Sequence, residues 1–197
     1  MNIKKLTRHN FAEIVDDAVR IIKSGGIIIA PFDTVYGFIV DPRNELALKK
    51  IFELKKRPQN KTIGLAVDST ETLISLVTPN HPNLPQNPDF FNHTLIFKAD
   101  INSLSKYCLK NGTVAIRIPN SDLIKAIVKS AGGVLAQTSA NLSGQPACAS
   151  IDQIKAQFGP EELDQVDFII DGGIIKKSAP SKIFDLTGVQ PIEISRN

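Results

Sequence analysis

The chain lacks most of the sequence signatures that would assign a nucleotide site or a hydrolase directly. Neither a Walker phosphate-binding loop nor the glycine-rich Rossmann fingerprint occurs in its 197 residues. No Gly-x-Ser-x-Gly elbow is present, so a hydrolase triad is unsupported. His9, His81 and His93 follow no metal-ligand spacing, and Cys108 and Cys148 can form neither a zinc site by themselves nor a disulfide scaffold.

The chain also lacks a long apolar run. No stretch approaches the roughly 18 residues of a membrane-spanning helix, and the basic start is not followed by the pattern of a signal peptide. We therefore expect a cytoplasmic protein folded as one domain over residues 1–197, which is long enough to bury a sizeable core. A net charge of +3 and a pI of about 8.8 are too mild to indicate nucleic-acid binding by themselves.

Three polar segments stand where apolar runs end, which is where α/β proteins place functional groups. They are Pro31–Gly37, Lys55–Pro58 and Thr138–Gly144. The first and third carry hydroxyl groups, and the second carries fixed positive charge within a basic cluster that extends over residues 49–61. Together they suggest an anionic-substrate site, and specifically a nucleotide site built without a phosphate-binding loop.

The order of apolar periodicities predicts an α/β fold, with a twisted mixed β-sheet flanked by helices. A capping box is expected at Asn10 and Glu13, and a second one at Ser150 and Gln153. Helices are predicted from Asn10 to Ile22, Asn44–Lys56, Ser69–Val77, Asp122–Ser130 and Ile151–Phe158. Strands are predicted at Ile27–Ala30, Thr62–Val67, Thr94–Lys98, Thr113–Ile118, Val134–Gln137, Phe168–Ile170, Lys182–Leu186 and Ile192–Ser195.

Each polar segment also has an ordinary structural explanation. Lysines at a helix C-terminus complement the helix dipole, which accounts for Lys55 but not for Arg57 or Lys61 beyond the helix. Ser, Asn and Gly at residues 138–144 are turn residues in any fold, and Tyr36 can be a packed aromatic side chain. Arg117 interrupts an apolar strand and needs an anionic partner, which is either a structural carboxylate or a substrate carboxylate.

Taken together, the motifs resemble those of the YrdC-like family of threonylcarbamoyl-AMP synthases, over nearly the whole length from Gly25 to Arg196. No single motif is specific, but their order and spacing are. The matching segments are Pro-x-Asp-Thr-Val-Tyr-Gly from Pro31, Lys55-x-Arg57 with Pro58, Arg117-Ile118-Pro119, Ser139-x-Asn141-x-Ser143-Gly144, Asp171-Gly172-Gly173 and Pro180-Ser181.

The resemblance implies a single-domain YrdC-like fold with a positively charged concave groove. It also implies that L-threonine, bicarbonate or CO2, and ATP with Mg2+ are joined into threonylcarbamoyl-adenylate with release of pyrophosphate. A partner transferase complex would then place the threonylcarbamoyl group on the adenosine beside the anticodon of tRNA.

Site roles follow by similarity, residue by residue. Lys55 and Arg57 would be catalytic, while no protein side chain would bind the metal. The nucleotide would be held by Lys55, Arg57, Lys61, Thr113, Ser139, Asn141 and Arg196. Threonine would be held by Thr34, Tyr36, Arg117 and Ser181, with Arg117 on its carboxylate.

The chain departs from the family pattern at several positions near the expected threonine pocket. Phe32 replaces the usual Thr, Ala66 replaces a polar or His side chain, and Phe91-Asn92-His93 replaces Pro-Gly-Pro. The proline-rich segment 78–92 is expected to form a long loop.

Three alternatives compete with the synthase. A non-catalytic module that binds tRNA or double-stranded RNA would use the basic cluster but would not require Arg117 inside a strand. A paralogue without synthase activity would be expected to lose the Lys-x-Arg and Ser-x-Asn pairs, both of which are present. A carbamoyl-transfer domain of a hydrogenase-maturation factor would belong to a much longer chain with zinc-finger cysteines.

Overall fold

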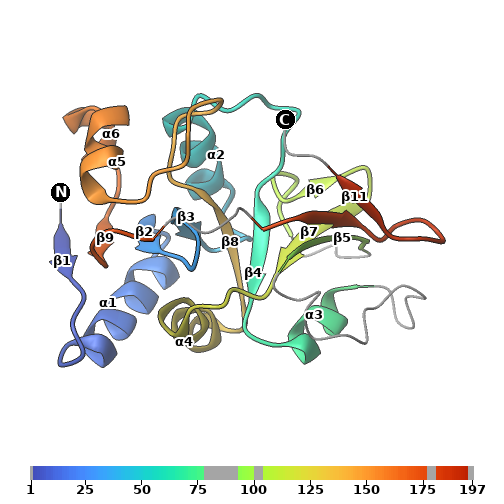
Figure 1. Ribbon diagram of the computed structural model, residues 1–197, viewed down its shortest axis with the longest axis horizontal. Coiled ribbons are helices and arrows are strands. Elements are labelled where there is room, and N and C mark those ends of the chain that lie inside the picture. The colour runs from blue at the N-terminus through green and yellow to red at the C-terminus, as the bar shows by residue number, and fades with distance from the viewer. Residues whose placement is uncertain (1, 78–92, 100–103, 177–180, 195–197) are drawn as a thin grey trace.

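A computed structural model describes residues 2–77, 93–99, 104–176 and 181–194 (Figure 1). Within these residues the helices are α1 (Phe11–Lys23), α2 (Glu45–Leu54), α3 (Thr70–Leu76), α4 (Asp122–Ala131), α5 (Ile151–Gln157) and α6 (Pro160–Leu163). The strands are β1 (Ile3–Lys5), β2 (Ile28–Pro31), β3 (Tyr36–Val40), β4 (Gly64–Val67), β5 (Thr94–Lys98), β6 (Leu109–Lys110), β7 (Thr113–Arg117), β8 (Val134–Ser139), β9 (Phe168–Asp171), β10 (Ile183–Asp185) and β11 (Ile192–Ile194).

All strands of the described residues join one sheet in the order β1-β9-β2-β3-β8-β4-β7-β5-β10-β11, with β6 paired to β7. The sheet is mixed, because it contains parallel pairs, such as β9 with β2 and β4 with β7, and antiparallel pairs, such as β3 with β8 and β5 with β7. The expected twisted mixed sheet with flanking helices is therefore confirmed.

Two apolar clusters cover the two faces of this sheet. On one face, α1 and α4 lie side by side and pack over β2, β8 and β4 (Figure 1). On the other face, α2 and α5 cover Phe38, Leu65 and Ala136. Since successive strand residues point to opposite faces, each central strand contributes apolar side chains to both clusters. The uninterrupted apolar run of β2, whose Ile28, Ile29 and Ala30 are fully buried, follows from this arrangement.

Most predicted elements are confirmed to within about two residues, but the segment after β2 is not the loop that we expected. Tyr36 and Gly37 begin strand β3, which returns antiparallel to β2 through a short turn at residues 32–35. The Asn10 capping box was also wrong, because the Asn10 carboxamide oxygen accepts from the backbone N–H of Thr7 and caps no helical N–H. The expected loop at 78–92 lies outside the described residues.

Candidate functional site

A pocket of about 510 Å³ opens on the face of the sheet that α1 and α4 cover only in part. Its walls come mainly from the turn after β2, the segment after α2, and strands β3, β4, β5, β7, β8 and β10. The lining residues are Phe32, Thr34, Val35, Tyr36, Gly37, Arg57, Thr62, Gly64, Thr94, Ala115, Arg117, Gln137, Thr138, Ser139, Ala147, Ser181 and Ile183.

The register of the strands places the side chains of the pocket floor in successive rows across the sheet, and each row is called a step below. Leu135, Gln137 and Ser139 point to the same face of β8, because side chains two residues apart in a strand share a face. Leu135 lies under α4, whereas Gln137 and Ser139 lie in the pocket. Gln137 pairs with Gly64, and Arg117 lies one step back, in the row that contains Leu135. Adjacent steps are about 7 Å apart along a strand, so Gln137 lies between Arg117 and Ser139.

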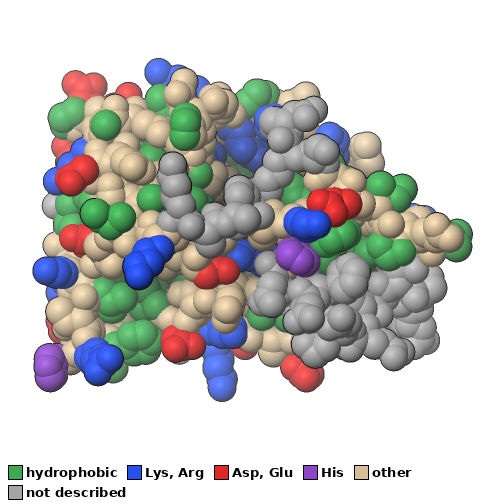
Figure 2. All heavy atoms as spheres, viewed as in Figure 1, with side chains coloured by type: hydrophobic (Ala, Val, Ile, Leu, Met, Phe, Trp, Pro, Cys, Tyr) green, Lys and Arg blue, Asp and Glu red, His purple; other side chains and the backbone are tan. Residues whose placement is uncertain are grey.

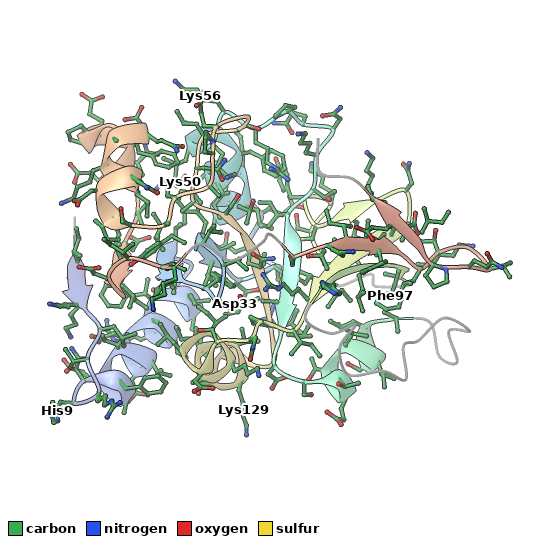
Figure 3. All side chains as sticks on the ribbon, in the orientation of Figure 1. His9, Asp33, Lys50, Lys56, Phe97 and Lys129 are labelled. Carbon is green, nitrogen blue, oxygen red and sulfur yellow. The ribbon has the colours of Figure 1, made fainter. Side chains whose placement is uncertain are left out.

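Arg117 is buried at the inner end of the pocket and forms an ion pair with Asp33 from the turn after β2. Figure 3 shows Asp33 near the middle of the molecule, beside β4 and β8. Burial lowers the pKa of Arg117, and the Asp33 carboxylate opposes that shift. Within the described residues the Arg117 Nε–H has no hydrogen-bond acceptor. Of the two anionic partners expected for this strand arginine, a structural carboxylate is present, and the Nε–H of the guanidinium is left to bind a further anion.

Arg57 reaches the same pocket from the end of α2. The helix ends in a Schellman motif: the backbone N–H of Lys56 donates to Glu53 O at 3.0 Å, and that of Arg57 donates to Phe52 O at 2.9 Å. Lys56 takes the left-handed conformation, with φ 48°, that this motif requires. The Arg57 guanidinium donates to Thr62 O at 2.6 Å, and its Nε–H has no acceptor in the described part of the chain. Burial lowers the pKa of this arginine as well.

Lys55 lies two residues before Arg57 but points into the protein. Its ammonium donates to Ser139 O, to Asn141 O at 2.7 Å and to Asn141 Oδ1 at 3.4 Å. The Asn141 amide nitrogen is used within its own loop, where it donates to Leu142 O at 2.8 Å and to Gln145 O at 2.7 Å. Neither Lys55 nor Asn141 lines the pocket.

The other residues that were predicted to bind the nucleotide do not lie together in one pocket. Ser139 lies on the pocket floor. Lys61 is exposed and borders a second hollow of about 430 Å³, which shares Thr62 with the main pocket. The Thr113 hydroxyl donates to Lys110 O at 2.6 Å and lines neither hollow. Arg196 lies outside the described residues.

The predicted threonine residues meet in the main pocket, although their hydroxyl groups are used differently. Thr34 lines the pocket, and Ser181 is buried beside Thr94, with 3.5 Å between the hydroxyl oxygens. The Tyr36 phenol donates to Gly173 O at 2.8 Å and accepts from the Gly172 N–H at 3.0 Å. Its burial raises the pKa of Tyr36 to about 12. Tyr36 therefore shapes the pocket by tying β3 to the segment after β9.

Sequence reasoning missed several lining residues, above all Gln137. The Gln137 side chain is half-buried, makes no hydrogen bond that the described residues provide, and lies 3.6 Å from where a Cβ on Gly64 would stand. Its position two residues before Ser139 in the same strand was the available signal.

Of two residues that depart from the family pattern, Phe32 lines the pocket and Ala66 does not. The Phe32 ring lines the pocket and lies against Gly37, where an added Cβ would stand 2.6 Å from the ring. Ala66 is buried under α1 and α4 instead.

Fold and pocket together define an α/β protein with a polar, arginine-containing site on one face of a mixed sheet. The family model for Sua5, YciO and YrdC proteins, described as "Telomere recombination", matches residues 20–197. The chain belongs to this Sua5/YciO/YrdC family.

Relatives that are named threonylcarbamoyl-AMP synthase support the same family assignment. The threonylcarbamoyl-AMP synthase of Saccharophagus degradans is 33% identical over 173 residues, which cover 85% of this chain and 87% of the relative. The enzyme of the same name from Klebsiella pneumoniae is 31% identical over 183 residues, which cover 90% of this chain and 94% of the relative.

Solved structures share the fold. P. abyssi Sua5 in complex with L-threonine superposes with a TM-score of 0.83 at 25% identity, over 98% of this chain and 56% of the Sua5 chain. The chain thus spans little more than half of that Sua5 protein. E. coli YciO matches in fold with a TM-score of 0.76 at 23% identity, over 98% of this chain and 92% of YciO.

Proposed function

We propose that this protein is a threonylcarbamoyl-AMP synthase, which forms threonylcarbamoyl-adenylate and pyrophosphate from L-threonine, bicarbonate or CO2, and ATP. The observation that carries the proposal is the presence of two arginines, Arg57 and Arg117, in one pocket, each with a buried Nε–H that lacks an acceptor within the described residues. Unsatisfied guanidinium donors are costly unless a ligand completes them, and carboxylates and phosphates match their geometry. The names of the curated relatives identify the reaction class.

The chemistry needs two anions held together and no covalent enzyme intermediate. The amine of threonine captures CO2 as a carbamate and loses a proton. A carbamate oxygen then attacks the α-phosphorus of ATP, so that a new P–O bond forms while the bond to the bridging oxygen breaks and pyrophosphate leaves. Catalysis of this kind depends on positioning and on stabilising charge at phosphorus.

The steps of the pocket floor fit that order of groups. Arg117 would bind the threonine carboxylate, with Thr34 and Ser181 around the amino acid. Arg57 would hold the phosphates, with Lys61 beside the adjoining hollow. Gln137 lies between Arg117 and Ser139, where the carbamate would stand, and its side-chain amide can donate to a carbamate oxygen.

The remaining substrate contacts stay proposals of the same kind. Ser139 would contact the nucleotide from the outer step of the floor, and Arg196, which lies outside the described residues, would complete its site. Mg2+ would enter with ATP as the counterion of the triphosphate. The described residues contain no cluster of three or more His, Cys, Asp or Glu side chains that could hold a metal ion.

A role in tRNA modification follows from the proposed product, because threonylcarbamoyl-adenylate is an activated donor that a transferase complex would consume. The non-catalytic RNA-binding alternative is not favoured by the relatives, which are named as synthases. On the face that Figure 2 shows, basic and acidic side chains of the described residues are interspersed.

None of the helices in the described segments has the length and apolar character needed to cross a membrane. A cytoplasmic location stays a prediction.

The proposal is tested by pyrophosphate release from ATP with Mg2+ and bicarbonate, measured with and without L-threonine, with serine as the control amino acid. We expect release that requires both threonine and bicarbonate. Binding of ATP without release would indicate a protein that has lost the reaction, and the absence of ATP binding with salt-sensitive RNA binding would support the RNA-binding alternative.

A further inference from the structure

Lys55 differs from the other cations of the basic cluster because it is fully enclosed. Its relative exposure is 1%, whereas the adjacent Lys56 is exposed and points away from the body of the molecule in Figure 3. An ammonium group has three N–H donors, and Lys55 directs them at three oxygens, two of which are backbone carbonyl groups. No donor of Lys55 remains for a phosphate.

The acceptors of Lys55 all lie in one short segment. Ser139 is the last residue of β8, and Asn141 stands two residues further along the chain. The backbone carbonyl of Lys55 also accepts a hydrogen bond, at 2.8 Å, from the N–H of Ser143. The end of α2 and the segment 139–143 are thus joined through both the side chain and the main chain of Lys55.

This segment carries polar side chains and backbone groups that regular sheet pairing does not satisfy. Beyond Ser139 the chain leaves the sheet, and unpaired buried carbonyl groups cost free energy. The Lys55 ammonium donates to the carbonyl groups of Ser139 and Asn141, and the Ser139 carbonyl also accepts from the backbone N–H of Asn141 at 3.0 Å. Burial and the nearby positive charge of Arg57 lower the pKa of Lys55 to about 7, which accords with an enclosed amine.

We propose that Lys55 is a positioning residue that clamps the segment 139–143 and so holds Ser139 on the pocket floor, while Arg57 alone of the pair binds the phosphates. This inference rests on the proposed function for the identity of the ligands but not for the clamp itself. It assigns different roles to two cations that are two residues apart in one motif.

Hydrogen–deuterium exchange tests the clamp without any need for turnover. In Lys55→Met, which has nearly the same length and no donors, we expect amide exchange over residues 139–145 to become at least about tenfold faster. Lys55→Arg, which keeps N–H donors, should restore part of the protection, and the matched control Lys56→Met should leave it unchanged. Unaltered exchange in Lys55→Met would overturn the proposal.

Binding of two ligand fragments separates positioning from phosphate contact. Calorimetric titration with inorganic tripolyphosphate and with AMP should show that Lys55→Met binds tripolyphosphate within about twofold of wild type but loses at least about tenfold in AMP affinity. Arg57→Ala should lose tripolyphosphate affinity instead. Equal loss of tripolyphosphate affinity in both variants would show that Lys55 contacts phosphate and would overturn the clamp.

These outcomes stay distinguishable from a failure of the proposed function. A wild-type protein that releases no pyrophosphate would refute the synthase, whereas the exchange experiment would still decide the role of Lys55. If Lys55→Met does not fold, Lys55→Arg in the same two experiments gives a variant with altered donor geometry, and unchanged exchange together with weakened tripolyphosphate binding would again refute the clamp.

Discussion

The segment around Lys55 and the pocket around Arg57 and Arg117 both contain buried cationic side chains, but the hydrogen-bond donors of these side chains are used differently. Near Lys55 the cation directs its donors at chain oxygens, and the Asn141 amide binds carbonyl groups of its own loop. In the pocket each arginine has one structural partner and one Nε–H without an acceptor among the described residues. A satisfied network rigidifies a structure, whereas an unsatisfied one is the natural place for a ligand. The comparison separates the groups that build the site from those that bind in it.

The largest effect is expected from removing the Arg57 guanidinium, which lines the pocket. Arg57→Ala should lower pyrophosphate release about a thousandfold, because a charge-assisted contact to the reacting phosphates is lost. The unfolding midpoint should change little, since the Arg57 side chain makes one hydrogen bond, to a backbone carbonyl, and the backbone hydrogen bond of residue 57 is kept. Turnover assays together with denaturant unfolding check this, with Lys49→Ala as an exposed control on α2. Near-normal turnover would remove Arg57 from the mechanism.

A second change tests whether the ion pair of Arg117 with Asp33 stabilises the folded protein. Asp33→Asn should lower the free energy of unfolding by about 3 kcal/mol, because breaking a buried ion pair leaves the guanidinium without its counter-charge. Chemical denaturation at neutral pH measures the loss. A change within a few tenths of a kcal/mol would show that the Asp33 carboxylate does not stabilise the fold.

How far the sequence predicts this arrangement depends on the range of the interactions. The central strand Ile28–Pro31 follows from a local apolar run, and the end of α2 follows from Pro58. The hairpin of β2 and β3 was missed because polar residues at 33 and 34 mark a turn as readily as a loop.

The site was predicted as a set of segments but not as a division of roles. Lys55 and Arg57 received the same catalytic role from their shared motif, and the contact of Lys55 with the segment after β8 separates their roles. Gln137 has no motif of its own, because its position in the pocket depends on the register of β8 with β4.

A smaller effect is expected from the middle step of the pocket floor. Gln137→Leu should lower kcat/KM for threonine about tenfold, which corresponds to the loss of one neutral hydrogen bond to the substrate. Gln145→Leu is the matched control, since Gln145 is exposed in the loop that follows Ser139. Steady-state kinetics at saturating ATP measures both variants. Equal kinetics for the two variants would mean that the Gln137 amide touches no substrate.

The smallest effect is expected from removing the Tyr36 hydroxyl, a group whose hydrogen bonds are satisfied within the protein. The Tyr36 phenol joins β3 to Gly172 and Gly173, and Tyr36→Phe should cost about 1 kcal/mol of unfolding free energy near neutral pH. Burial raises the pKa of Tyr36 to about 12, above the value of 10.0 for a free phenol. Between these values the unfolded chain releases the proton first, so the advantage of the wild type over Tyr36→Phe is complete below pH 10 and is lost as pH rises toward 12. Urea unfolding of both proteins across this range, with phenolate absorbance as a second probe, measures the shift. A difference that stays constant to pH 12 would show that the phenol is not the buried, bonded group that closes this side of the pocket.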